Sequence, residues 1–100
     1  MSIIRKIFGL GPKVDVHELL RNGAALIDVR TPAEFSAGHA KGATNIPLDK
    51  IKSKVDKIKQ LKKPVVLCCQ SGMRSAQATS ILKGAGITDA YNGGGWHNFA

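Results

Sequence analysis

The stretch VVLCCQSGMRSAQATSILKGAG, residues 65–86, places an apolar run and two adjacent cysteines directly before a glycine-containing turn and a helical pattern. A short, continuous apolar run is typical of a strand buried in a parallel sheet, and residues 74–83 have the composition of the following helix. Successive strand residues point to opposite faces of the sheet. We therefore predict that Cys68 packs in the core and that Cys69, the last strand residue, faces the turn.

The turn after Cys69 has the features of an anion-binding loop. Gly72 permits backbone conformations that larger residues resist, and a helix that begins near Arg74 would aim the amides of residues 70–74 at the sulfur. Such a ring of N–H groups lowers the pKa of a thiol below its usual value of about 8.5, and the thiolate is the nucleophilic form. The same spacing fits a buried cysteine before an ordinary turn equally well. Spacing alone therefore does not decide between a nucleophilic cysteine and a structural one.

Working outward, strand patterns alternate with helical patterns along the chain, which is typical of an α/β domain with a largely parallel sheet. Ligands bind such sheets beyond the carboxyl ends of the strands, where Cys69 falls. Before the strand and helix described above, we expect a helix over 14–23, a strand over 25–29, a helix capped by Thr31 and closed by Gly38, a strand over 43–47 and a helix over 50–63. After them we expect a strand over 88–92 and a tight turn that places Trp96 and Phe99 over the core.

Composition bounds the class of protein. With 100 residues and 43% hydrophobic residues, the chain suits one domain with an aliphatic core, and two adjacent cysteines cannot form a useful disulfide framework. Free thiols indicate a reducing compartment, and the apolar and basic segment 1–13 is too short for a secretory leader or a membrane span. A cytoplasmic protein without a transmembrane segment is therefore expected.

The positive charge is concentrated in one segment. Residues 50–63 contain seven lysines and one aspartate, which accounts for +6 of the net charge of +8. Ile51, Val55, Ile58 and Leu61 recur there at helical spacing, which predicts an amphipathic helix with a solvated lysine face. An adaptor that binds an acidic partner through this face is an alternative. Nucleic-acid binding is not expected, because no aromatic residue interleaves the lysines for base stacking.

Three motifs, in order, resemble the signatures of the rhodanese-like sulfurtransferase family, and specifically a single-domain rhodanese. They are LIDVRTPAEFSAGHAKGATNIPL (26–48), CQSGMRS (69–75) and YNGGGWHNF (91–99). The resemblance covers about residues 14–97. It implies a three-layer α/β domain over 14–100, with a largely parallel five-stranded sheet and helices on both faces, preceded by an N-terminal extension over 1–13.

The resemblance also implies a chemistry. Cys69 would take a sulfane sulfur from thiosulfate or a persulfide donor and pass it to cyanide or a thiol, without a metal or organic cofactor. The loop residues Gln70, Ser71, Gly72, Met73 and Arg74 would bind the substrate, with Arg74 contacting an anionic donor. A carrier of persulfide from a protein partner, or a redox-sensing module, is the alternative. Phosphatase activity is not expected, because cysteine phosphatases need Cys-x5-Arg and the sixth residue after Cys69 is Ser75.

Asp28 and Arg30 lie at the end of the first predicted strand, and so near the same sheet edge as Cys69. We expect them to form a structural ion pair that ties the strand end to the segment GHAKGA (38–43), although a role in orienting the active loop is an alternative. His39, in that segment, is predicted to be structural, and the spacing of His17 and His97 does not indicate a metal site.

Overall fold

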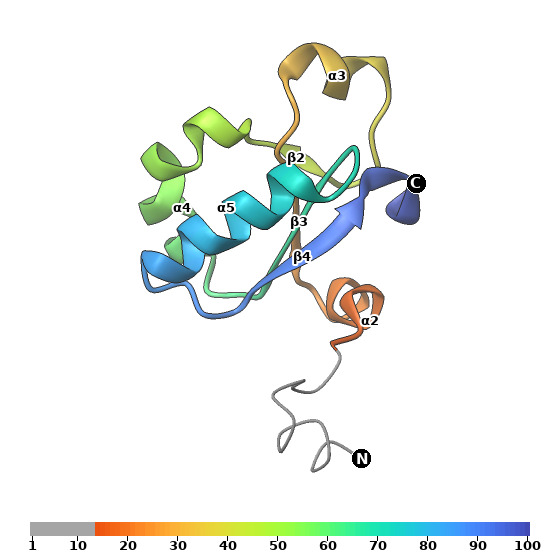
Figure 1. Cartoon of the computed structure of the whole chain (residues 1–100). Coiled ribbons are helices and arrows are strands. Elements are labelled where there is room, and N and C mark those ends of the chain that lie inside the picture. The colour runs from red at the N-terminus through yellow and green to blue at the C-terminus, as the bar shows by residue number, and fades with distance from the viewer. Residues whose placement is uncertain (1–13) are drawn as a thin grey trace, which may run out of the picture.

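The computed structural model describes residues 14–100 (Figure 1). The expected N-terminal extension over 1–13 lies outside the described residues. The elements run in the order α2 (Val16–Arg21), β1 (Ala25–Asp28), α3 (Pro32–Ala37), β2 (Thr44–Asn45), the 3-10 turns η1 (Leu48–Lys50) and η2 (Lys52–Lys54), α4 (Val55–Leu61), β3 (Val65–Cys69), α5 (Met73–Gly84), β4 (Ala90–Gly95) and the 3-10 turn η3 (Trp96–Phe99).

The strands form one parallel sheet in the order β2-β1-β3-β4. From the central neighbours β1 and β3 the chain proceeds in opposite directions along the sheet, to β2 and to β4. The carboxyl edge between two such strands is a topological switch point, the usual ligand site of open α/β sheets. Cys69 ends β3 at this point.

The α/β class and the parallel sheet are confirmed, but the described residues contain four strands where five were expected. The fifth strand was implied by the family resemblance, whereas residues 14–100 contain four segments with a strand pattern. All of β3, and β1 from Leu26 onward, is buried, as expected for parallel strands that are covered on both faces.

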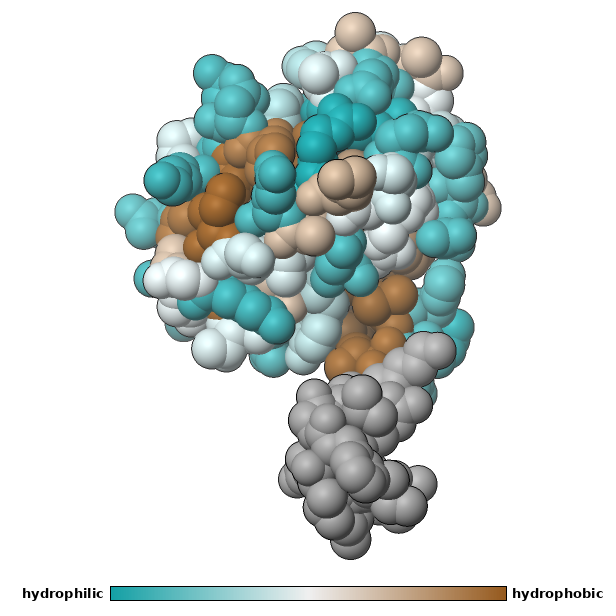
Figure 2. All heavy atoms as spheres, in the orientation of Figure 1, coloured by the Kyte–Doolittle hydropathy of each residue, from teal (hydrophilic) through white to brown (hydrophobic). Residues whose placement is uncertain are grey.

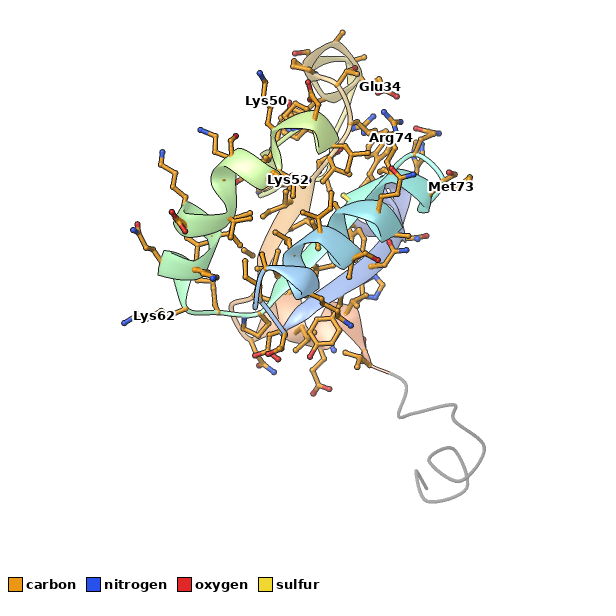
Figure 3. The ribbon with its side chains drawn as sticks, turned by 60° about the vertical axis from the view of Figure 1, so that its left-hand side comes forward. Glu34, Lys50, Lys52, Lys62, Met73 and Arg74 are labelled. Atoms are coloured by element: carbon orange, nitrogen blue, oxygen red, sulfur yellow. The ribbon has the colours of Figure 1, made fainter. Side chains whose placement is uncertain are left out.

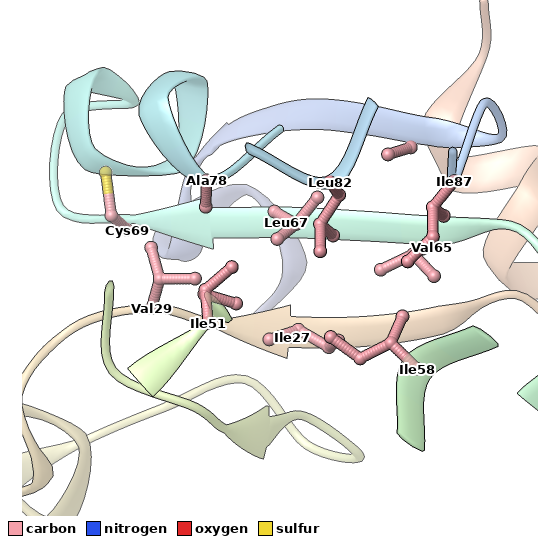
Figure 4. Packing of buried hydrophobic residues seen from close by; sticks show 11 residues of the cluster. Ile27, Val29, Ile51, Ile58, Val65, Leu67, Cys69, Ala78, Leu82 and Ile87 are labelled. Atoms are coloured by element: carbon pink, nitrogen blue, oxygen red, sulfur yellow. The ribbon is translucent and has the colours of Figure 1, made fainter. Parts of the chain in front are cut away.

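Two hydrophobic clusters lie on opposite faces of the sheet, so helices cover both faces as predicted. One cluster joins β1 and β3 to α4 and α5 through residues that include Ile58, Leu67 and Leu82 (Figure 4). The other joins the opposite side of the same strands to α2 and η3, where Trp96 and Phe99 pack. Trp96 and Phe99 therefore close over the core as expected.

The helix caps of α2 and α3 follow the sequence signals. Asp15 accepts N–H bonds at the start of α2. Thr31 and Glu34 form a reciprocal capping box with Pro32 in the first turn, and α3 ends at Gly38. Figure 1 shows α3 at the carboxyl end of the sheet and α2 at the opposite end.

The lysine-rich helix is shorter than predicted. Two 3-10 turns occupy residues 48–54, and α4 begins only at Val55. Ile51 and Ile58 are buried, but Leu61 at the helix end is 45% exposed. The apolar spacing therefore marks the packed face correctly without fixing the type of helix, because 3-10 turns can bury the same side chains.

The glycine run after Asn92 continues β4 and is not the tight turn that was expected. Gly93 is the extra residue of a β-bulge, since Asn92 pairs with Leu67 and Gly94 with Cys68. A Cβ atom on Gly93 would come within 2.8 Å of side chains of Val66 and Phe99. The turn is made instead by η3.

The surface agrees with this arrangement. In Figure 2, hydrophilic residues cover much of the visible face, and hydrophobic side chains reach the surface in a strip where α4 faces α5 and in a second patch at α2. Figure 3 shows Lys50 and Lys62 pointing away from the domain, and Lys52 is exposed as well. Among residues 14–100, no helix combines the length and apolar character that crossing a membrane requires.

Candidate active site

The two cysteines occupy different environments, as strand alternation predicts. Cys69 belongs to the cluster under α5, where Figure 4 shows it near Val29 and Ala78. Cys68 belongs to the cluster on the opposite face. Both are free thiols, and Cys69 is 1% exposed. The sulfur of Cys69 therefore lies at the bottom of its loop.

The sulfur of Cys69 accepts hydrogen bonds from the start of α5. The amide of Gly72 donates to Sγ at 3.0 Å and the amide of Ser75 at 3.4 Å, while the hydroxyl oxygen of Ser75 lies 3.5 Å away. Helix α5 has 12 residues, so the positive end of its dipole also faces the sulfur. This arrangement stabilises a thiolate.

Opposing effects act on the thiol of Cys69. Burial raises its pKa, whereas hydrogen bonds from the Ser75 hydroxyl and from the amides of Ser75, Gly72 and Ser71 lower it, and the net pKa is below the ordinary value. Cys68 shows the contrast. Burial, together with the carboxylate of Asp28, raises its pKa to about 12. Of the two thiols, Cys69 is therefore the one whose surroundings favour the thiolate.

Ser75 and Asn92 join the loop to β4, and neither was singled out from the sequence. The hydroxyl of Ser75 donates to Asn92 Oδ1 at 2.6 Å, and Asn92 Nδ2 donates to the carbonyl oxygen of Gly72 at 3.1 Å. The amide of Gly94 donates to the same Oδ1 at 3.0 Å. These bonds fix the loop against the strand that carries the glycine run.

Gly72 is needed for this close approach. It has a φ of +98°, and an added Cβ would lie 3.2 Å from the Cα of Gly94. A side chain at position 72 would therefore be strained by its backbone conformation and would press against β4.

The other predicted loop residues have separate surroundings. Gln70 is exposed and its Oε1 accepts a bond from Trp96 Nε1 at 3.1 Å. Ser71 is exposed, and its hydroxyl accepts a long bond from the amide of Met73. The side chain of Met73 is 75% exposed at the rim of the loop. The structure thus places this part of the loop at the surface, above the buried sulfur.

Arg74 is engaged by a residue that sequence reasoning assigned only to a helix cap. Its Nη1 and Nη2 donate to Glu34 Oε1 and Oε2 at 2.7 and 3.0 Å. Figure 3 shows the two side chains lying toward one another. Contact of Arg74 with an anionic donor stays a prediction, and in this structure the guanidinium has a carboxylate partner.

Asp28 and Arg30 form the expected structural pair. Arg30 Nη2 donates to Asp28 Oδ2 at 2.8 Å and to the carbonyl oxygen of Gly38 at 2.7 Å, with both charged side chains nearly inaccessible. The guanidinium also lies 4.6 Å from the centre of the Trp96 ring. This network ties the end of β1 to the end of α3. His39 is structural too, since its Nδ1 lies 2.7 Å from the carbonyl oxygen of Phe35.

Two surface hollows help to place the site. One lies beside the loop and includes Arg74 in its lining, along with Val29, Thr31, Pro47, Leu48 and Asp49. Another, of about 790 Å³, lies at the opposite end, where Ala25 begins β1 and Lys63 precedes β3. Substrates of open parallel sheets bind at the carboxyl ends of the strands, and the smaller of these two hollows lies at that end. Residues 14–100 hold no cluster of three or more His, Cys, Asp or Glu side chains that could bind a metal ion.

Comparison with known proteins places this chain among the rhodanese-like proteins. The thiosulfate sulfurtransferase 16 of Arabidopsis thaliana is 40% identical over 83 residues, which cover 72% of this chain and 69% of the relative. The uncharacterized protein YqhL of Bacillus subtilis is 48% identical over 69 residues, covering 69% of this chain; the match spans about half, 54%, of that relative's length.

A solved structure has the same architecture. The structure described as a rhodanese with anions from E. coli superposes with a TM-score of 0.71 at 35% identity, covering 78% of this chain and 93% of that one. The family model for the rhodanese-like domain matches residues 13–100. This chain belongs to the rhodanese-like domain family.

Proposed function

We propose that this protein is a sulfurtransferase in which Cys69 carries a sulfane sulfur as a persulfide. The observation that carries the proposal is the cradle of N–H groups from Gly72 and Ser75 around the sulfur of Cys69. A stabilised thiolate at the end of a central strand is suited to nucleophilic attack on sulfur.

The reaction has two balanced halves. The thiolate of Cys69 attacks the outer sulfur of thiosulfate, the S–S bond of the donor breaks, and sulfite leaves with the bonding electron pair. Cys69 is then a persulfide anion, Cys–S–S⁻. A cyanide ion or a thiolate acceptor attacks the outer sulfur, forms thiocyanate or a new persulfide, and returns Cys69 to the thiolate. No external oxidant, reductant or metal takes part.

The loop supplies the binding groups for this cycle. In the proposal, the amides of residues 70–74 bind the outer sulfur of the persulfide, and the guanidinium of Arg74 contacts the donor. The adjacent Cys68 takes no part, because its side chain packs on the opposite face of the sheet. The same chemistry accommodates a physiological donor or acceptor that is a small molecule, and one that is a persulfide or thiol group of another protein.

Steady-state kinetics test the proposal. Thiocyanate formation from thiosulfate and cyanide should give parallel double-reciprocal lines, the pattern of a ping-pong mechanism. Cys69→Ser should abolish turnover, while the matched variant Cys68→Ser should retain it. Turnover in Cys69→Ser would overturn the assignment. Absence of turnover in the natural protein, together with transfer from a persulfidated protein partner, would indicate the carrier function instead.

A further inference from the structure

The side chains of Glu34 and Arg74 form a two-point ion pair between α3 and the start of α5. Two nitrogen–oxygen contacts of 2.7 and 3.0 Å join them, and the side chains are 37% and 34% exposed. The pair lies at the rim of the loop that holds Cys69 (Figure 3). Arg74 is the one cationic residue in the loop sequence CQSGMRS.

Glu34 is held in position independently of Arg74. The amide and hydroxyl of Thr31 donate to Glu34 Oε1 at 3.0 and 3.1 Å. The helix that carries Glu34 is fixed in turn, because Arg30 donates to the carbonyl oxygens of Glu34 and Gly38. The carboxylate is therefore directed at Arg74 by the fold. Hydrogen bonding to Arg74, with that to Thr31, lowers the pKa of Glu34 to about 2, so it is ionised at neutral pH.

This pairing changes what an approaching donor encounters. A guanidinium binds oxyanions through paired N–H groups, and Glu34 already uses one N–H group on each terminal nitrogen of Arg74. The pair has no net charge, and an oxyanion must compete with the carboxylate or be repelled by it. Asp49 adds a second carboxyl group to the hollow that Arg74 lines, whose other lining residues include Val29, Pro47 and Leu48.

We propose that Glu34 is a specificity-determining residue that cancels the charge of Arg74 and so favours singly charged sulfur donors, such as persulfides, over dianionic thiosulfate. The inference rests on the sulfurtransferase function proposed above. The apolar part of the hollow supports it, since that surface suits the carbon-containing carrier of a persulfide better than a small, strongly hydrated dianion.

Donor charge is the variable to test. Thiosulfate carries two negative charges, and methanethiosulfonate carries one while presenting the same sulfur–sulfur bond; its attack by Cys69 releases methanesulfinate and leaves the same persulfide. Glu34→Gln removes the charge and keeps a side chain that can complete the capping box. Glu18→Gln is the matched control, because Glu18 also lies in the first turn of a six-residue helix, α2, at the opposite end of the sheet.

With cyanide as acceptor, Glu34→Gln should raise kcat/KM for thiosulfate by roughly three- to tenfold, mainly through KM, with a smaller gain for methanethiosulfonate. The gain should shrink at high ionic strength, which screens the exposed charges. Glu18→Gln should leave the ratio of kcat/KM for thiosulfate to kcat/KM for methanethiosulfonate unchanged. An unchanged ratio in Glu34→Gln would overturn the inference, because a purely structural ion pair would not discriminate by donor charge.

A binding measurement separates this inference from the proposed function. In a Cys69→Ser background, where no persulfide can form, calorimetric titration with thiosulfate should show a dissociation constant roughly three- to tenfold lower after Glu34→Gln. Equal constants with and without Glu34→Gln would overturn the inference whether or not the natural protein turns over. Absence of turnover in the natural protein with both donors would instead count against the proposed function.

Discussion

The hydroxyl of Ser75 lies between two acceptors. It donates to Asn92 Oδ1 at 2.6 Å, while its oxygen is 3.5 Å from the sulfur of Cys69. When Cys69 ionises, the same hydroxyl can turn and donate to the thiolate, because Asn92 Oδ1 keeps the N–H bond from Gly94. A hydrogen bond to a charged acceptor is the stronger one, so ionisation favours this exchange.

Ser75→Ala should therefore raise the pKa of Cys69, since the thiolate loses a donor and its burial is unchanged. The rate of alkylation by iodoacetamide at neutral pH should fall several-fold, and its pH profile should move to higher pH. Ser80→Ala, the same change at an exposed position of α5, should leave the profile in place. A profile unaltered by Ser75→Ala would show that the backbone amides alone set the pKa.

Residue roles were predictable only where they depend on neighbours in the chain. Alternation along β3 is local, and it separates Cys68 from Cys69 correctly. The partners Ser75 and Asn92 are 17 residues apart, and Glu34 and Arg74 are 40 apart. Such pairs depend on how elements pack. The sequence predicts the helix cap at Glu34, and the family resemblance implies a contact of Arg74 with the donor, but neither indicates the contact between the two side chains.

At the scale of elements, the Glu34–Arg74 pair couples α3 to α5. Burial is partial, so the pair contributes modestly to stability at neutral pH. The folded protein holds the pKa of Glu34 at about 2, against an ordinary value of 4.5. A depressed folded pKa means that the stabilisation is fully present above about pH 4.5 and is lost as the pH falls toward 2.

Urea unfolding of the natural protein and Glu34→Gln should show this dependence. The natural protein should be the more stable at pH 7, and the difference between the two midpoints should narrow as the pH is lowered from 5 to 3. Glu18→Gln should show no comparable narrowing. A difference that stays constant over that pH range would mean that the pair does not stabilise the folded state through the ionised carboxylate.

Elements were predictable where caps and apolar runs are strong. The capping box of α3 and the apolar run of β3 have local causes, and both lie where expected. The glycines of β4 mark a bulge and a close approach of packed side chains, which a turn-forming composition does not distinguish from a turn. Likewise, the spacing of apolar residues over 50–63 does not distinguish two 3-10 turns from the first turns of a long α-helix.

At the scale of the whole molecule, the buried pair of Asp28 and Arg30 connects the sheet to the segment that covers its carboxyl edge. The side chains are 0% and 3% exposed. Arg30 reaches the carbonyl oxygens of Glu34 and Gly38 and stacks on Trp96, so one guanidinium contacts α3 and the C-terminal turn. Removal of the carboxylate would leave a buried cation without its counter-ion.

Asp28→Ala should lower the free energy of unfolding by about 3 to 5 kcal/mol, the usual cost of breaking a buried ion pair. Urea denaturation measures this loss. Asp56→Ala removes an exposed carboxylate from α4 and should lower the free energy of unfolding by about 1 kcal/mol or less. A loss for Asp28→Ala no larger than that of Asp56→Ala would show that the other contacts of Arg30 suffice.

The sequence already indicates a parallel sheet, and this predicts that the candidate site lies at the carboxyl edge of the sheet. Alternating strand and helix patterns predict a parallel sheet, and a parallel sheet gathers the ends of its strands at one edge. Strand number did not follow in the same way, because the fifth strand came from the resemblance and the described residues form four. The large hollow at the amino ends, bounded by α2 and the C-terminal residues, depends on tertiary packing and has no sequence signal.

The most direct test of the central claim is the intact mass of the protein after incubation with thiosulfate and then with cyanide. The natural protein and Cys68→Ser should each gain the mass of one sulfur atom and lose it on addition of cyanide, and Cys69→Ser should gain none. A sulfur adduct on Cys69→Ser, or its loss in Cys68→Ser, would contradict the assignment of Cys69 as the residue that carries the persulfide.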